Sequence, residues 1–419
     1  MRSAPLVQRG FSPLDEELEL GPGAFSPRLV EGIVLLGAQM PFERVPATLD
    51  HFTQVEVGVD TARRLTERAG AALEAAERME AKQLEREWAE VAGPAVQQLS
   101  VDGAMVPLVG GEWAEVKTLA IGTVRQGQSA GAEPRTTDLS YFSRLTDAAE
   151  FTELARIEVH RRGTDTAGTV CAVMDGAEWL QGFVDCMRPD AVRILDFPHA
   201  AEHLSRAGQA AFGPGTAEAS EWLGRQWHEL KHGDPDAVLD ALRTLEMERA
   251  PCPEEAEAVR GGVVSYLTKR REQVAYAQFQ EEGFPIGSGM VESANKLLVE
   301  ARLKGSGMHW ERSHVNPMLT LRCAVCSGRW KEAWNRIWQG LRRAQAQERR
   351  ARRLRRHPPP PPEIATPAAP VGNPSPPKSR PPRPPKKGLM VDGHPTDDHP
   401  WKKEPLSHSA RDLALSAKL

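Results

Sequence analysis

Apolar positions in the N-terminal part of the chain recur with the period of an α-helix. Two apolar stripes follow that period between residues 26 and 86, formed by Leu29, Ile33 and Leu36 and by Ala62, Leu65, Ala69 and Leu73. The segment FTQVEVGVDTARRL between them contains Gly58 and a candidate N-cap at Asp60 or Thr61. The pattern predicts two short helices that meet at a turn, as in a helix-turn-helix.

From residue 95 onward the apolar runs become short and are bounded by glycine. The runs SVDGAMVPLVG and EVKTLAIGTV predict two adjacent strands whose connection contains Gly110 and Gly111. TVCAVM and AVRILDF predict two more buried strands, and GAEWLQGFVDCM predicts a helix between them. Since strands and helices alternate here, we expect an α/β fold.

The rest of the chain divides by composition. From Ala200 to Ala277 charged residues interleave with Leu, Trp and Ala at helical spacing, which predicts a helical insertion. Beyond Trp338 the apolar periodicity is lost; eight arginines lie between residues 342 and 356, and a proline-rich stretch follows, which is typical of a disordered tail. The expected organisation is an N-terminal remnant (1–25), a helical region with the helix-turn-helix (26–94), the first part of the α/β core (95–199), the insertion (200–280), a helical part of the core (281–340) and a basic, proline-rich disordered tail (341–419).

Composition excludes several classes of protein. The chain has 419 residues and a net charge of only −4, but its charges are segregated into acidic and basic segments. No run of about 18 apolar residues is present, and the N-terminal MRSAPLVQRGF lacks the apolar core of a signal peptide. Five scattered cysteines do not suggest a disulfide framework. We therefore expect a soluble cytoplasmic protein.

Three carboxylates are spaced as a two-metal phosphoryl-transfer enzyme would need them. Asp102 and Asp175 each follow an apolar run and precede a glycine, where a strand is expected to end in a tight turn. Glu292 follows a glycine-bearing turn, Gly287 to Gly289, at the start of a helix-prone stretch. Carboxylates bind Mg²⁺, and two such ions about 3.5 to 4 Å apart can activate a water or a 3′-hydroxyl and stabilise the leaving oxygen.

The acids and their neighbours also fit ordinary structural roles or a different metal site. Asp-Gly is a common turn dipeptide, and a lone glutamate on a helix is usually a solvated side chain. Asp196, His199 and His203 in DFPHAAEH could bind zinc for a hydrolytic reaction, because histidines four residues apart share a helix face; alternatively Asp196 caps a helix and His199 packs against the sheet edge. Cys323 and Cys326 form a CxxC without a second pair, which favours buried thiols over a metal site.

Several motifs, in order, carry a resemblance to a known family. DGAEW, ILDFPHAAEHL, GSGMVESANK, RLKGSGMHW, NPMLTLRCAVCSGRW and the terminal DHPW resemble bacterial insertion-sequence transposases of the Kra type, which are similar to the Mutator-like DDE transposases. The resemblance runs from about Arg9 to about Trp338 and resumes at DHPW. Relatives carry a zinc-ribbon-like cysteine pair ahead of the RGFSPLD segment, whereas this chain has no cysteine there, so we expect a shortened N-terminus.

The resemblance implies a ribonuclease-H-like catalytic core that uses two Mg²⁺ or Mn²⁺ ions. By position, Asp102, Asp175 and Glu292 become the catalytic, metal-binding DDE acids, and Asp196 and His199 match the family's (C/D)xxH signature near the active site, which disfavours the zinc-hydrolase hypothesis. Five cations are expected to contact DNA, three of them on the second helix of the helix-turn-helix and two after Glu292: Arg63, Arg64, Arg68, Arg302 and Lys304.

The expected function is therefore transposition. The protein would cut double-stranded DNA at the ends of an insertion sequence and join the freed 3′-hydroxyls to target DNA, as a homo-oligomer on DNA at the nucleoid and without a membrane. A DNA-binding protein derived from a transposase, catalytically inactive or repurposed, is the alternative. A metal-dependent nuclease that cleaves without joining is a third possibility. The basic arm from Arg342 to Arg356 is expected to bind DNA phosphates without sequence preference.

Overall fold

The computed structural model describes most of the chain between residues 25 and 356. The described ranges are 25–84, 89–127, 133–248, 250–356, 390–391 and 394–395. The chain divides into two units, residues 1–358 and 359–419. In the described part of the second unit, two short strands, β6 (Met390–Val391) and β7 (His394–Pro395), pair antiparallel. The expected N-terminal remnant, except Phe25, and the proline-rich stretch from Pro358 lie outside the described residues.

A five-stranded mixed sheet lies at the centre of the first unit, so the expected α/β class is confirmed. Its order is β3-β2-β1-β4-β5; β1 pairs antiparallel with β2 and parallel with β4, β2 pairs antiparallel with β3, and β4 pairs parallel with β5. The strands are β1 (Val96–Pro107), β2 (Trp113–Arg125), β3 (Arg135–Arg144), β4 (Thr169–Met174) and β5 (Val192–Leu195). The predicted connection between β1 and β2 contains Gly110 and Gly111, both with positive φ.

Alternating side chains of β1 divide between two apolar layers. Leu99 and Val101 pack with α5 (Ala148–Arg161) and α6 (Glu178–Met187). Ala104 and Val106 pack on the opposite face with α12 (Gly289–Asn295), η3 (Lys296–Glu300), α13 (Ala301–Leu303) and α14 (Arg312–Cys326). The period-two pattern of the sequence thus assigns even-numbered positions of β1, Asp102 included, to the face covered by α12.

The expected helical region at the N-terminus is present. It comprises α2 (Pro27–Gln39), η1 (Phe42–Arg44), α3 (Val45–Thr53) and α4 (Val59–Leu84). The turn between α3 and α4 follows Gln54, which has a left-handed backbone conformation and ends α3. However, α4 is 26 residues long, because its buried face, which includes Ala69 and Leu73, continues along α14 and α15 (Trp330–Arg356). It is a core helix of this region rather than a short second helix.

The segment from residue 341 to 356 is helical, which corrects the expectation that the tail loses its structure at residue 341. Helix α15 begins with stacked Trp330, Trp334 and Trp338, and it approaches α4 so closely that a Cβ at Gly340 would lie 3.1 Å from that of Ala72. Alanine, glutamine and arginine are good helix formers, so the sequence beyond this anchor can continue the helix despite its density of like charge.

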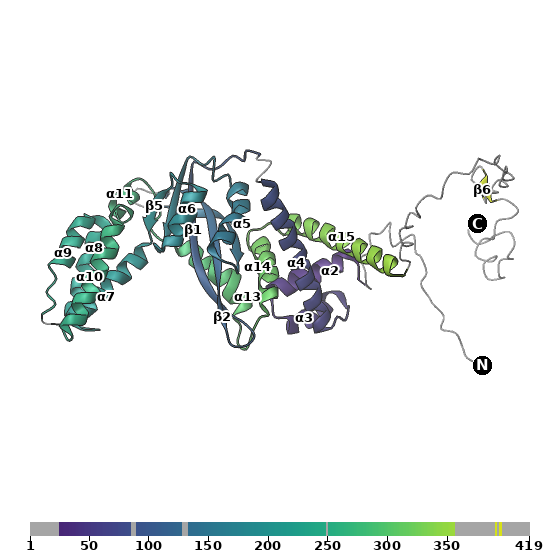
Figure 1. The fold of residues 1–419 in the computed structure, drawn as a ribbon, viewed down its shortest axis with the longest axis horizontal. Helices are drawn as coiled ribbons and strands as arrows, with labels where there is room; N and C mark the ends of the chain where they lie inside the picture. Colours follow the sequence, from purple (N-terminus) through teal and green to yellow (C-terminus); the bar gives the residue numbers. More distant parts are fainter. Residues whose placement is uncertain are drawn as a thin grey trace, which may run out of the picture. The chain divides into compact units, whose positions relative to one another are not determined.

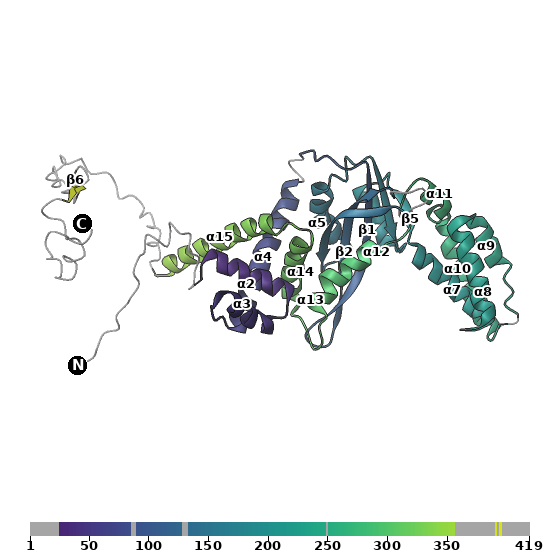
Figure 2. The ribbon, with the colours of Figure 1, turned by 180° about the vertical axis from the view of Figure 1, so that it is seen from behind.

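The expected insertion is confirmed as helical in the residues described. It consists of α7 (Phe197–Phe212), α8 (Ala217–His232), α9 (Pro235–Arg243), α10 (Pro253–Lys269), η2 (Arg271–Gln273) and α11 (Tyr276–Glu281). In Figure 1 these helices lie beyond β5, at the opposite end of the sheet from α2, α3, α4 and α15, and Figure 2 agrees from behind. Among the helices described, none combines the length and the apolar character needed to span a bilayer.

Candidate active site

Asp102 lies within β1, not at its end. Asp102 and Gly103 pair with Thr118 and Lys117 of β2, and β1 continues to Pro107, so the expectation of a tight turn at Asp102-Gly103 is corrected. The strand continues because β2 pairs with it along its whole length. On its other side β1 pairs with β4 only as far as Leu99, so the Asp102 side chain lies where β1 has lost one neighbour.

Asp175 follows the last residue of β4, and here the predicted turn is confirmed. Gly176 has a φ of +83°, which favours glycine, and the Asp175 carboxylate accepts a hydrogen bond of 2.9 Å from the Ala177 backbone N–H. Leu99 pairs with Ala172 in the parallel register, and extending that register by three residues brings Asp102 level with Asp175. The sheet thus places these two acids on neighbouring strands at the same height.

Glu292 is on α12, as its sequence predicts, and its side chain is exposed. One turn later on the same helix, Asn295 is buried and donates a hydrogen bond of 2.9 Å from Nδ2 to the Asp102 carboxylate. This contact joins the helix of the third acid to the strand of the first. The helix then continues as the π-helical segment η3, a rare conformation that is frequent at functional sites.

The three acids interact electrostatically. Burial raises the pKa of Asp102 above its usual range, and the charges of Asp175 and Glu292 raise it further, although hydrogen bonds from the Gly103 N–H and Asn295 oppose the shift. None of the three forms an ion pair with a lysine or arginine in the described part of the chain. The three carboxylates are therefore not neutralised by direct ion pairs; the nearby Arg270 guanidinium binds the Gly176 carbonyl instead.

The donor chemistry of this site fits a hard divalent cation. Besides the three carboxylates, the Oδ1 atom of Asn295 is buried without a hydrogen-bond partner, and its amide is oriented by the bond that Nδ2 donates to Asp102. Carboxylate and amide oxygens are the ligands that Mg²⁺ and Mn²⁺ prefer. As they stand, however, no three His, Cys, Asp or Glu side chains among residues 25–356, apart from the gaps, are close enough together to hold a metal ion.

Asp196 joins two parts of the site. It is the N-cap of α7 and is 5% exposed; its Oδ2 accepts the backbone N–H of His199 at 3.1 Å, and its Oδ1 accepts that of Ser288 at 2.6 Å. Ser288 immediately precedes α12, so one carboxylate fixes the start of the helix that carries Glu292. The Gly287 carbonyl of the same turn accepts a hydrogen bond of 3.1 Å from Gln98 on β1.

The zinc site considered for Asp196, His199 and His203 is not formed. Both Asp196 oxygens accept backbone hydrogen bonds, as the capping alternative predicts. His199 packs edge-on against His203 with ring centroids 5.0 Å apart, and His203 stacks on Tyr266 at 4.0 Å. Burial, together with the charge of His199, lowers the pKa of His203 to about 4, so its imidazole is neutral at physiological pH.

Two expected DNA contacts, Arg302 and Lys304, differ from one another. Arg302 is 1% exposed; it donates a hydrogen bond to the Gly37 carbonyl and lies over the rings of Phe42 and Trp310. Burial lowers its pKa to about 10. The expectation that Arg302 contacts DNA is therefore wrong, because its guanidinium is buried against the Gly37 carbonyl and the rings of Phe42 and Trp310. Lys304 is partly exposed and pairs with Glu300 at 3.3 Å.

The three expected arginines of the helix-turn-helix are exposed on α4. Arg63 and Arg64 pair with Asp60 of the same helix, at 2.7 and 3.0 Å. Arg68 lines a groove of about 840 Å³ between α4 and α15. Exposure is compatible with DNA contact, which stays a prediction for all three.

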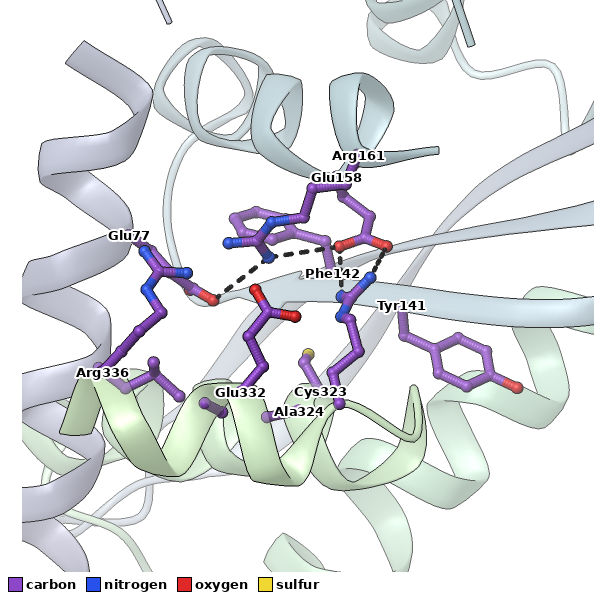
Figure 3. A pocket seen from close by; sticks show the side chains of 12 residues that line it. Glu77, Tyr141, Phe142, Glu158, Arg161, Cys323, Ala324, Glu332 and Arg336 are labelled. Carbon is purple, nitrogen blue, oxygen red and sulfur yellow. Dashed lines mark hydrogen bonds and ion pairs between the residues drawn. The ribbon is translucent and has the colours of Figure 1, made fainter. Parts of the chain in front are cut away.

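A second group of charges lies around the end of the edge strand β3, where Figure 3 shows acids and arginines around a cavity of about 20 Å³. Arg329, immediately before α15, donates hydrogen bonds of 2.8 and 2.5 Å to the Glu158 carboxylate on α5. Glu77 of α4 pairs with the buried Arg144 of β3. Arg161 lies 3.9 Å from Glu77 and 3.8 Å from Glu158 and so links the two pairs. We call this group, Glu77, Arg144, Glu158, Arg161 and Arg329, the paired cluster.

Sequence reasoning did not identify Asn295, Gln98, Tyr266 or Arg270 as parts of the site. Tyr266 and Arg270, both at the end of α10, donate hydrogen bonds to the carbonyls of Asp175 and Gly176. Asn295 could have been found, because it lies one helical turn after Glu292 in GSGMVESANK. The others had no local signal, since their partners are 91 to 189 residues away in the chain.

Neither a scan of protein-family models nor a search of curated proteins finds a match to this chain. The resemblance to Kra-type transposases therefore stays a prediction that rests on the sequence motifs.

Proposed function

We propose that this protein is a DDE-type transposase, which cleaves DNA at the ends of an insertion sequence and joins the freed 3′-hydroxyls to target DNA. The observation that carries the proposal is that three acids 73 to 190 residues apart in the chain come to one end of β1: Asp102 is level with Asp175 in the sheet, and Asn295, one turn after Glu292, binds the Asp102 carboxylate. Acids brought together without a cationic partner destabilise a fold, so such a site is a candidate for function.

The order of elements supports the same proposal. In a ribonuclease-H-like core the first acid lies on the first strand, the second at the end of the fourth, and the third on a late helix, often after an insertion. Here Asp102 lies on β1, Asp175 directly after β4, and Glu292 on α12 after the helical insertion. The mixed sheet, with the order β3-β2-β1-β4-β5 and only β2 opposite to the other strands, is compatible with the proposed ribonuclease-H-like core.

The side chains of Asp102, Asp175 and Glu292 would hold two Mg²⁺ or Mn²⁺ ions. When bound, such ions stabilise the charge that develops on the attacking and leaving oxygens of an in-line phosphoryl transfer. The protein itself orients the acids: the Ala177 N–H holds the Asp175 carboxylate, Asn295 holds that of Asp102, and Asp196 fixes the start of the helix that carries Glu292. Orientation of this kind lowers the entropic cost of reaching the reactive geometry.

The test uses a supercoiled plasmid that carries the DNA flanking the gene on both sides. We expect Asp102→Asn, Asp175→Asn and Glu292→Gln each to lower Mg²⁺-dependent cleavage and joining by several orders of magnitude, with double variants no worse than single ones, because the acids act as a unit. DNA affinity, measured by filter binding, should change less than threefold, since the acids are not expected to supply the binding energy.

Matched controls separate this effect from a general loss of charge. Glu300→Gln removes an exposed glutamate two turns beyond Glu292, and Asp138→Asn removes an exposed aspartate of β3; both should retain wild-type cleavage. Wild-type cleavage by any of the three site variants would remove that residue from the assignment. Cleavage without joined products would instead indicate a metal-dependent nuclease.

A second candidate is a DNA-binding protein derived from such an enzyme but without its activity. It is favoured by one observation, that no three potential ligands among the described side chains are close enough together to hold a metal ion. The same plasmid assay distinguishes the two candidates, because this one predicts DNA binding without cleavage at any Mg²⁺ or Mn²⁺ concentration.

A further inference from the structure

Two tyrosines of the helical insertion each hold the end of a core strand. The Tyr266 hydroxyl, on α10, donates a hydrogen bond of 2.6 Å to the backbone carbonyl of Asp175, directly after β4. The Tyr276 hydroxyl, at the start of α11, donates one of 2.8 Å to the carbonyl of Leu195, the last residue of β5. The insertion therefore contacts the backbone from which Asp175 projects.

Arg270 strengthens the contact at Asp175. It lies one helical turn after Tyr266, with its guanidinium 3.9 Å from the centre of the Tyr266 ring, and donates hydrogen bonds of 3.2 and 2.6 Å from Nε and Nη2 to the Gly176 carbonyl. The approach is so close that a Cβ at Gly176 would lie 2.6 Å from Arg270 Nε and 2.7 Å from Tyr266 Oη. Two successive carbonyls of the turn are thus bound by Tyr266 of α10 and by Arg270, the C-cap residue of this helix.

The Tyr266 ring is itself supported by the insertion. His203 of α7 stacks on it at 4.0 Å with an interplanar angle of 15°, so the ring lies between an imidazole and a guanidinium. A ring packed on both faces has little rotational freedom, and its hydroxyl is therefore aimed at a fixed point. The same helix is joined to α6 by Lys269 and Glu178, 3.0 Å apart.

We infer that Tyr266 and Arg270 are positioning residues for Asp175, through which the helical insertion sets the position of this carboxylate in the metal site. The inference rests on the proposed function. With its carbonyl held by Tyr266 and its carboxylate held by the Ala177 N–H, Asp175 is restrained at both ends. Removal of the Tyr266 hydroxyl frees the Asp175 carbonyl and leaves Arg270, at the Gly176 carbonyl, as the remaining contact from the insertion to this turn. Groups that orient metal ligands contribute about 10- to 100-fold to metal affinity.

The experiment measures Mn²⁺ binding to the full-length protein by electron paramagnetic resonance, without DNA and without turnover. The test variant is Tyr266→Phe, which deletes one hydroxyl and keeps the ring between His203 and Arg270. We expect its Mn²⁺ affinity to fall about tenfold. Arg270→Met, which removes the hydrogen bonds to Gly176, is a second test variant and should weaken Mn²⁺ binding in the same direction.

The two other tyrosines of the chain supply the controls. Tyr276→Phe deletes a buried hydroxyl from the same insertion, and Tyr141→Phe deletes one from β3, far from Asp175 in the sheet; both should bind Mn²⁺ within about twofold of wild type. Thermal unfolding of each metal-free variant reports its loss of stability separately. A role of Tyr266 in stability alone would lower the Tm of Tyr266→Phe and leave its Mn²⁺ affinity unchanged.

The outcomes separate this inference from the function on which it rests. Weakened Mn²⁺ binding in Asp175→Asn with wild-type binding in both Tyr266→Phe and Arg270→Met would overturn the inference alone. An equal loss in Tyr276→Phe and Tyr266→Phe would also overturn it, because the effect would not be specific to Asp175. Wild-type Mn²⁺ affinity in Asp175→Asn would overturn the proposed function together with the inference.

Discussion

The candidate active site and the paired cluster both bring carboxylates together at the central sheet, but only the paired cluster neutralises them with arginines. In the paired cluster Glu158, whose side chain is 1% exposed, is neutralised by the two nitrogens of Arg329, and Glu77 by Arg144. In the candidate site Asp102, Asp175 and Glu292 form no ion pair with a described lysine or arginine. Burial raises the pKa of Asp102, and the charges of the other two acids raise it further.

This difference distinguishes charge that stabilises the fold from charge available for a ligand. A buried carboxylate is costly unless a counter-ion and hydrogen bonds compensate it. In the paired cluster the arginines that compensate are supplied by β3, α5 and the residue before α15, and the cluster thereby joins α4 and α15 to the sheet. In the candidate site the negative charge of the carboxylates is only partly compensated, so these carboxylates remain available to bind a divalent cation.

The largest difference between the two sites is expected for a matched pair of Glu-to-Gln substitutions. Glu158→Gln leaves the guanidinium of Arg329 without its carboxylate, and we expect it to lower the free energy of unfolding by about 3 to 5 kcal/mol. Glu292→Gln changes an exposed, unpaired side chain and should alter the free energy by no more than about 0.5 kcal/mol. Urea denaturation of both variants, without metal, measures the difference. Equal losses of unfolding free energy in the two variants would contradict the distinction between a stabilising cluster and a ligand site.

Added metal should stabilise the folded protein through the candidate active site and not through the paired cluster. At a Mn²⁺ concentration 100 times the dissociation constant, a ligand that binds only the folded protein adds about 2.7 kcal/mol of stability. We expect this gain in the wild type. Glu80→Gln, which removes a glutamate that pairs with Arg161 of the paired cluster, should show the same gain. Asp102→Asn should lose it. Thermal unfolding with and without Mn²⁺ measures the gain. A gain of the same size in Asp102→Asn would place the binding site elsewhere.

The smallest effect concerns pH. The pKa of Asp102 is raised in the folded protein, so the folded state binds the proton more tightly than the unfolded state. Metal-free wild type should therefore gain stability relative to Asp102→Asn as the pH falls through the raised pKa, and should lose that gain as the pH rises above it. Parallel Tm measurements between about pH 4 and pH 7 report the difference. A Tm difference between wild type and Asp102→Asn that stays constant across this pH range would contradict the raised pKa of Asp102.

The elements of the fold were predictable where the apolar period was clear. The strand pair around Gly110 and Gly111, the turn at Asp175 and the helical insertion all follow from local pattern. The same local signal failed at Asp102, because an Asp-Gly pair also fits within a strand when a long partner strand continues beside it. It failed again beyond residue 340, where helix propensity outweighs the repulsion of the arginines.

The candidate site was predictable only in part. The three acids could be named because each stands at a recognisable junction in the sequence, but the side chains that hold them could not. Arg302 shows the limit most clearly: an arginine beside a site acid was expected to reach DNA, yet a buried backbone carbonyl and two aromatic rings bind it inside the core. Burial depends on residues such as Gly37 and Phe42, which are more than 250 positions away, and no local pattern reports them.

The most direct test of the proposed metal site is anomalous X-ray scattering from crystals of the protein soaked in Mn²⁺. We expect two anomalous peaks about 3.5 to 4 Å apart, each within ligand distance of carboxylate oxygens of Asp102, Asp175 or Glu292. The same peaks should be absent from crystals of the variant that combines Asp102→Asn, Asp175→Asn and Glu292→Gln. Peaks that persist in this variant, or a wild-type crystal with none at the three acids, would contradict a metal site formed by these residues.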